Sequence, residues 1–144
     1  MVSTLIVQPE NGATIQRGAT VPFACTTSNM ETGFFDDPQR LYYATPQTLN
    51  AEGVIQGHQH ISIQRIASTT TAPDPRSESL SFFVGLNTKA DAQGVHTATI
   101  PATTFTQPGV YRICTITGTR GHQPVIMPVA RRGSQDDCIR VTVA

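Results

Sequence analysis

No stretch of this chain repeats apolar residues at the 3.6-residue period of a helix, whereas several short stretches alternate apolar and polar residues. The clearest is at residues 139–143, where Arg140 and Thr142 stand between apolar neighbours. Alternation at period 2 places one set of side chains on each face of a β-strand. A chain of such strands, separated by turns rich in glycine and proline, folds as an antiparallel sandwich or barrel.

The composition agrees with an all-β fold. Charged residues make up only 14% of the chain, too few for the wet faces of a helical bundle. There are 11 glycines and 10 prolines among 144 residues, which supplies many turns. We expect an immunoglobulin-like antiparallel β-sandwich, with residues 1–144 as a single domain and a long loop at 118–137 before the last strand.

The expected strands are separated by turn-forming clusters. They lie at residues 5–7, 13–15, 20–26, 54–66, 80–84, 95–100, 108–116 and 139–143. Residues 28–53 show no regular pattern but include two phenylalanines and two tyrosines. Because so many aromatic side chains are costly to leave in water, we expect this segment to pack on the sandwich.

Two histidines, His58 and His60, occupy alternate positions of the strand expected at 54–66. Their side chains should lie on one face of that strand. A third, His122, lies in the 118–137 loop, which could fold over the pair. Three imidazoles suit a divalent transition metal, zinc or copper, and leave a position open for water or a substrate. The structural alternative is that all three histidines are polar packing residues.

The chain has three cysteines, which cannot all pair with one another. A bridge from Cys114 to Cys138 would close the long loop between the last two strands, and it is the preferred pairing. A bridge from Cys25 to Cys114 across the two sheets is the rival, and a fully reduced chain is the third possibility. In the preferred arrangement Cys25, at an inward strand position, is a buried free thiol.

Other patterns give weaker signals. Asp36-Asp37 and Asp136-Asp137 are adjacent pairs, whose side chains diverge on a strand and form no ready carboxylate dyad. We expect Arg131-Arg132 to anchor their loop by ion pairs with Asp136-Asp137, and His96 to be an ordinary strand residue. The chain has no Gly-x-Ser-x-Gly motif, no glycine-rich phosphate loop and no tryptophan. Its net charge of zero and scattered basic residues argue against nucleic-acid binding.

Several motifs together resemble a family of small secreted fungal proteins. The similarity spans most of the chain, and its most specific pieces are Gly57-His58-Gln59-His60, His122-Gln123-Pro124 and Arg132-Gly133-Ser134-Gln135-Asp136-Asp137-Cys138. The family's activity is unsettled, so the resemblance implies a compartment and no mechanism. The implied compartment is extracellular, with the signal peptide removed. From the residues alone a cytosolic protein is the alternative, and abundant threonine beside a single lysine, Lys89, favours the extracellular compartment.

The leading functional hypothesis is a secreted fungal binding protein with a surface histidine cluster, formed by His58, His60 and His122, that holds a metal ion. A metal-dependent enzyme, hydrolytic or oxidative, that uses the same three residues is the first alternative. A structural or host-interaction protein without a metal is the second. The ligand, whether small molecule, glycan or protein, is not specified by the sequence. We expect neither nucleic acid nor membrane as a partner, since no apolar run approaches the ~20 residues that span a bilayer.

Overall fold

The computed structural model describes all residues 1–144. The strands are β1 (Ser3–Gln8), β2 (Thr14–Ile15), β3 (Val21–Ser28), β4 (Met30–Thr32), β5 (Ile55–Arg65), β6 (Phe82–Leu86), β7 (Val95–Ile100), β8 (Gly109–Thr119) and β9 (Cys138–Val143). Two short helical segments complete the fold, α1 (Pro38–Leu41) and the 3-10 turn η1 (Ser77–Ser79). Neither has the length and hydrophobicity that crossing a bilayer requires.

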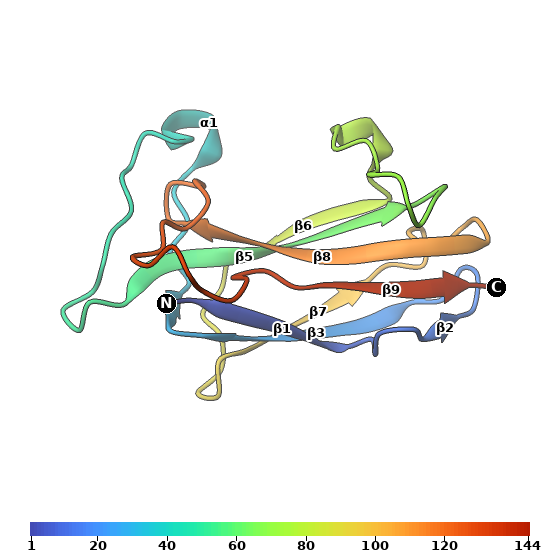
Figure 1. Ribbon diagram of the computed structural model, residues 1–144, viewed down its shortest axis with the longest axis horizontal. Helices are drawn as coiled ribbons and strands as arrows, with labels where there is room; N and C mark the ends of the chain where they lie inside the picture. Colours follow the sequence, from blue (N-terminus) through green and yellow to red (C-terminus); the bar gives the residue numbers. More distant parts are fainter.

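The strands form two sheets that stack face to face (Figure 1). One sheet has the order β1-β3-β7, and the other runs β2-β9-β8-β5-β4, with β6 also paired to β5. Pairing is antiparallel except for β2 with β9 and β4 with β5, which are parallel. The predicted β-sandwich with a long loop before its last strand is therefore confirmed. The two parallel pairs were not predicted, because alternation along a strand carries no information on the direction of its neighbour.

The main core lies between the sheets and contains 15 buried apolar residues. Ile61 and Ile63 enter it from β5, and Phe23 and Cys25 enter it from β3, all nearly inaccessible to solvent. The inward position predicted for Cys25 is therefore confirmed. Because the odd-numbered positions of β5 fill the core, the even-numbered positions, His58 and His60 among them, lie on the outer face.

The segment 28–53 is more regular than the sequence predicted, since it contains both β4 and α1. Pro38 begins α1, and the carboxylate of Asp37 caps it by accepting a hydrogen bond from the backbone N–H of Gln39 at 3.0 Å. Tyr42 and Tyr43 follow α1 and remain 61% and 50% exposed. The expectation that the sandwich covers the aromatic side chains of this segment is therefore wrong for the two tyrosines.

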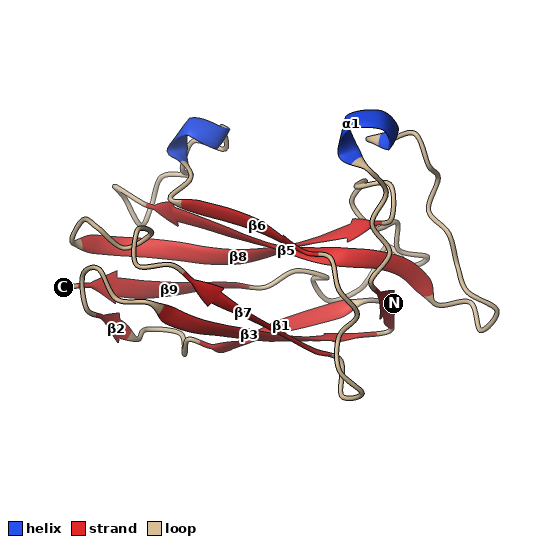
Figure 2. Ribbon diagram, turned by 180° about the vertical axis from the view of Figure 1, so that it is seen from behind, coloured by secondary structure: helices blue, strands red, loops and turns tan.

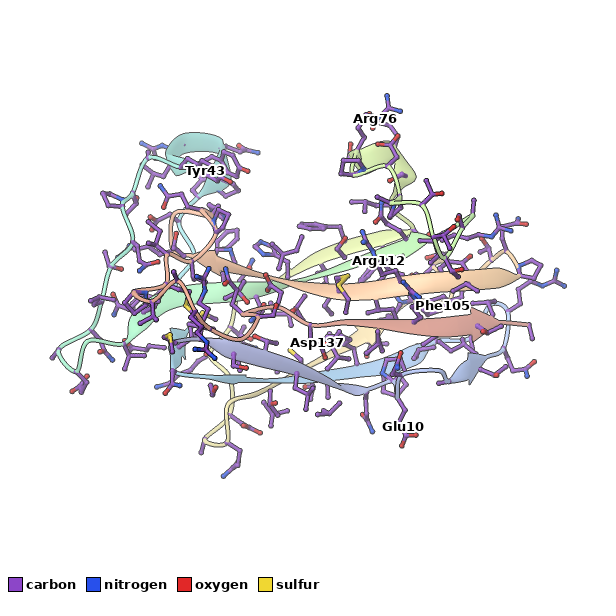
Figure 3. The ribbon with its side chains drawn as sticks, viewed as in Figure 1. Glu10, Tyr43, Arg76, Phe105, Arg112 and Asp137 are labelled. Carbon is purple, nitrogen blue, oxygen red and sulfur yellow. A yellow bond between two sulfur atoms is a disulfide. The ribbon has the colours of Figure 1, made fainter.

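Two projections stand on the outer face of the six-stranded sheet, at opposite ends, with α1 on one and η1 on the other (Figures 1 and 2). Tyr43 marks the first projection and Arg76 the second (Figure 3). Outward side chains of β5, β6 and β8 occupy the face between them. The projection with α1 is held against the loop that follows β8, because Tyr43 N–H donates to the Gly121 carbonyl at 2.9 Å.

A disulfide joins Cys114 of β8 to Cys138 of β9, which are directly opposite one another in the sheet, and Cys25 is a buried free cysteine. The preferred pairing is confirmed, and the cross-sheet bridge from Cys25 to Cys114 is excluded. The disulfide encloses a loop with a sequence separation of 24 residues that includes His122.

Acidic residues anchor this loop, but without the predicted arginines. Asp136 Oδ1 accepts hydrogen bonds from the backbone N–H and hydroxyl of Thr117, both at 2.7 Å. Asp137 Oδ2 accepts from the backbone N–H of Ile6 in the opposite sheet at 2.8 Å. The ion pairs of the structure are Arg76–Asp74 and Arg120–Asp36. The expected pairing of Arg131-Arg132 with Asp136-Asp137 is wrong, because backbone donors already occupy both carboxylates.

Candidate metal centre

The structure brings the three predicted histidines together on the outer face of the sheet. One ring nitrogen from each of His58, His60 and His122 lies within 4.8 Å of the other two. Three atoms so spaced share a point within about 2.8 Å of each, and bonds of about 2.0–2.1 Å join zinc to histidine. Side-chain shifts of less than about 1 Å would complete the coordination. His96 lies apart, buried on β7 opposite Cys25, as an ordinary strand residue.

Each imidazole uses one ring nitrogen to bond a backbone carbonyl oxygen. His58 Nδ1 lies 2.9 Å from the Phe34 carbonyl, and His60 Nδ1 lies 2.9 Å from the Ile116 carbonyl. His122 Nε2 lies 2.7 Å from the carbonyl of Asp36. A carbonyl oxygen only accepts, so all three nitrogens must carry the proton. Metal-bound histidines are held in the same way, by donation from the second ring nitrogen.

These hydrogen bonds fix the tautomers and leave a lone pair on His58 Nε2, His60 Nε2 and His122 Nδ1. His58 is fully buried, and its Nε2 has no hydrogen-bond partner. Leaving a buried acceptor unsatisfied costs on the order of 1–3 kcal/mol. A cation between the three rings would provide the missing partner.

Burial also keeps His58 and His60 in the form that a metal needs. Desolvation lowers the pKa of His58 to about 4, assisted by the nearby His60 and opposed by the hydrogen bond to the Phe34 carbonyl. Desolvation lowers the pKa of His60 as well, against the hydrogen bond to the Ile116 carbonyl. Both side chains are therefore neutral near pH 7, and neutral imidazole is the metal-binding form.

His122 is positioned by contacts between its loop and the segment after β4. Its backbone is left-handed, with φ of 71°, which is uncommon for a residue other than glycine and costs on the order of 1 kcal/mol or more. Arg120 Nη2 lies 2.8 Å from Asp36 Oδ1, and the Arg120 carbonyl accepts from the Asp36 N–H at 2.9 Å. Gln123 Nε2 donates to the Tyr43 carbonyl at 3.1 Å. Polar contacts of the residues on both sides of His122 thus stabilise its left-handed backbone conformation.

Three glycines allow the backbones around the cluster to approach closely. A Cβ at Gly57 would lie 2.1 Å from the Gly118 carbonyl oxygen, and one at Gly121 would lie 2.5 Å from the Thr45 carbonyl oxygen. Gly118 is directly opposite His58 in the sheet, and a Cβ there would lie 3.5 Å from His58 Nε2. The first two positions therefore exclude any side chain, and at the third a Cβ would be in van der Waals contact with the buried His58 ring.

A cavity of about 490 Å³ opens above the cluster, with His60 and His122 in its lining. Its aromatic members are Phe35, Tyr42, Tyr43 and Phe83. None of its 12 lining residues is Asp, Glu, Lys or Arg. The cavity is thus an uncharged, largely aromatic chamber beside the imidazoles.

Aromatic rings of the cavity wall pack directly against the imidazoles of the cluster. Phe83 stacks on His60 with centroids 5.3 Å apart, and Tyr42 stacks on His122 at 5.7 Å. Phe35 meets His58 edge to face at 4.9 Å and His122 at 4.8 Å. Sequence reasoning did not connect these aromatic residues with the histidines. The two consecutive aromatic pairs, Phe34-Phe35 and Tyr42-Tyr43, in a segment without periodicity were the signal available.

Comparison with known proteins relates nearly the whole chain to one family. A family model described as the CLU5d N-terminal domain matches residues 4–144. A curated relative, "Pathogenicity cluster 5 protein d" of the fungus Colletotrichum graminicola (strain M1.001 / M2 / FGSC 10212), is 40% identical over 146 residues. That match covers 99% of this chain and 30% of the relative, so the chain spans less than a third of the relative's length.

Similarity to solved structures is low. A mutant β-glucosidase from Listeria innocua in complex with laminaribiose matches with a TM-score of 0.47 and 12% identity, over 100% of this chain and 16% of that chain. The same enzyme in complex with glucose gives a TM-score of 0.41 and 14% identity, over 99% and 16% of the two chains. Likeness at this level carries no argument about what this chain does.

Proposed function

The chain belongs to the CLU5d N-terminal domain family, and from that premise we propose that it is a secreted fungal metal-binding protein. The metal is a divalent transition ion, zinc or copper, and its ligands are His58, His60 and His122. The observation that carries the proposal is the buried, unpartnered Nε2 of His58, in a cluster where one ring nitrogen from each of the three histidines lies within 4.8 Å of the other two. Three imidazoles in neutral form suit either ion.

The disulfide supports the extracellular part of the proposal. Disulfides persist in oxidising compartments and are rare in the cytosol. The relative named for a pathogenicity cluster comes from a fungus, which agrees with a protein that acts outside the cell. Appearance of the protein in the culture fluid of a producing fungus, with Cys114 and Cys138 paired, would support secretion. Retention inside the cells with three free thiols would contradict it.

Metal binding is tested on untagged protein that has been stripped with a chelator and titrated with zinc and, separately, with copper. We expect one ion per chain and a rise in melting temperature on loading, because a ligand that binds only the folded state stabilises it. His60→Ala removes a ligand from a half-buried position on the strand. Loss of an outer hydrogen-bond partner alone costs 10–100-fold in metal affinity, so loss of this ligand should cost at least about 100-fold.

His96→Ala is the matched control, because His96 is the one histidine outside the cluster. Circular dichroism of both variants checks that the β-sandwich is retained. Equal metal affinity of the parent protein, His60→Ala and His96→Ala would show that the three histidines form no metal site, and the proposal would be wrong.

A further inference from the structure

The cavity above the histidines defines the chemistry of a second ligand. We propose that the loaded centre takes an aromatic ring with two adjacent hydroxyl groups, an ortho-diphenol, whose oxygens coordinate the metal while its ring lies among Phe35, Tyr42 and Phe83. This inference rests on the proposed metal site, because the ligand is held from one side by the ion.

The cavity lies next to the metal cluster and shares two histidines with it. His60 and His122 belong both to the metal cluster and to the cavity lining, while His58 lies buried beneath them. The face of the ion away from His58 would therefore be turned towards the cavity. Three protein ligands leave at least one further position on zinc, which can expand to five-coordinate. A donor atom reaching the ion must enter through this aromatic chamber.

At the floor of the cavity, a glycine lies opposite each histidine of the β5 pair. In the sheet, His60 is directly opposite Gly85 of β6, and His58 is directly opposite Gly118 of β8. A Cβ at Gly85 would lie 2.5 Å from Asn87 Oδ1, so the amide of Asn87 occupies the space that a larger residue would take. Glycine opposite each histidine places no side chain of the neighbouring strand over the pair, and the group that fills the space beside Gly85 is the amide of Asn87.

The walls of the cavity present exposed aromatic rings. Phe83 is 51% exposed and Phe35 is 38% exposed, although both pack against imidazoles of the cluster. An aromatic surface left open around a cavity of about 490 Å³ is suited to a planar apolar body, which gains from burial and from ring stacking. A sugar is less suited, because the lining offers its hydroxyls a single side-chain amide, that of Asn87, and no charged side chain.

The absence of charged residues from the cavity lining indicates which kind of oxygen donor the ligand would bring to the metal. The cavity lining contains no lysine or arginine, so nothing besides the ion would attract an acid. An ortho-diphenol enters uncharged and releases two protons to solvent as both oxygens bond to the metal. The resulting dianion balances the charge of a divalent ion held by three neutral imidazoles. The step forms two oxygen–metal bonds, displaces bound water and transfers no electrons.

The test uses zinc, which has no redox chemistry, and compares catechol with its meta isomer resorcinol by isothermal titration calorimetry. Resorcinol has the same size and polarity but cannot chelate one ion. We expect the zinc-loaded protein to bind catechol at least tenfold more tightly than resorcinol, and the metal-free protein to show no preference. Phe83→Ala, kept saturated with zinc so that a change in zinc affinity does not enter the measurement, should weaken catechol binding at least threefold.

The outcomes separate the two proposals. Zinc binding with equal affinity for catechol and resorcinol would overturn this inference and leave the metal site intact. Zinc binding with a preference for glucose over catechol would also overturn it, in favour of a sugar site. Failure to bind zinc or copper at all would overturn the proposed function, and this inference with it.

Discussion

The backbone carbonyl oxygen of Asp36 lies 2.7 Å from His122 Nε2, while the carboxylate of the same residue holds Arg120 at 2.8 Å. One residue thus orients an imidazole and ties down the loop that carries it. Asp36 is 8% exposed, and hydrogen bonding to the Arg120 guanidinium is the main cause that lowers the pKa of its carboxyl. This arrangement has a consequence for metal affinity.

Asp36→Asn should lower zinc affinity by about tenfold, because a weaker hold on Arg120 lets the loop at His122 move. The measurement is a competition titration against a chelating dye. Asp74→Asn is the matched control, since Asp74 takes part in the second ion pair of the chain, with Arg76 at the far projection (Figure 3). Equal zinc affinity of the two variants would mean that the Asp36–Arg120 pair does not position His122.

Gly57→Ala should destabilise the sheet beside the metal cluster. The added Cβ would lie 2.1 Å from the Gly118 carbonyl oxygen, so β5 and β8 must separate. Overpacking of this kind costs about 1–3 kcal/mol in the free energy of unfolding, which urea denaturation measures. Gly133→Ala should change stability little, because a Cβ there has no neighbour within 4 Å. Similar losses for both variants would show that close strand approach at Gly57 is unimportant.

Replacing both Cys114 and Cys138 by alanine should lower the free energy of unfolding by about 3 kcal/mol, the cost of freeing a loop of this length in the unfolded chain. Zinc binding should survive, since Arg120, Asp136 and Asp137 hold the loop independently of the bridge. Urea denaturation and zinc titration of the same variant check both statements. Loss of zinc binding in a folded variant would mean that the disulfide itself positions His122.

Burial raises the pKa of the Cys25 thiol to about 11, so the native protein should resist alkylation at pH 8.5 while the unfolded chain reacts. The raised pKa of this thiol also makes the stability of the fold depend on pH. Above the unfolded thiol pKa of about 8.5 the unfolded state loses its proton first, so stability should fall as pH rises from there towards 11. Cys25→Ala should show a shallower decline in urea midpoints over this range. An equal decline would assign the loss to other groups.

Alternation along single strands predicted the inner faces correctly, because period-2 burial is a local property of a strand. It placed Ile61 and Ile63 on one face of their strand and His58 with His60 on the other, and in the structure the two isoleucines enter the core. His122 was linked to the pair only as a possibility, since where a long loop folds depends on contacts distant in sequence. The structure supplies those contacts through Asp36.

The surroundings of the cluster could not be predicted for the same reason. The carbonyls that fix the tautomers belong to Phe34, Asp36 and Ile116, and a backbone group leaves no mark in the residue type. The aromatic side chains of 28–53 were expected to be covered by the sandwich, on the ground that exposed rings are costly. Tyr42 and Tyr43 instead remain open at the cavity, a departure from local rules of the kind expected at a functional surface.

The disulfide also determines how the fold would transmit tension. Cys138 is the first residue of β9, and Cys114 belongs to β8, which is hydrogen-bonded to both β9 and β5. A pull on Ala144 could peel away only residues 139–144 before the force passed through the sulfur–sulfur bond into β8. Residues 115–137, with His122 among them, would stay slack while the rest of the chain was stretched.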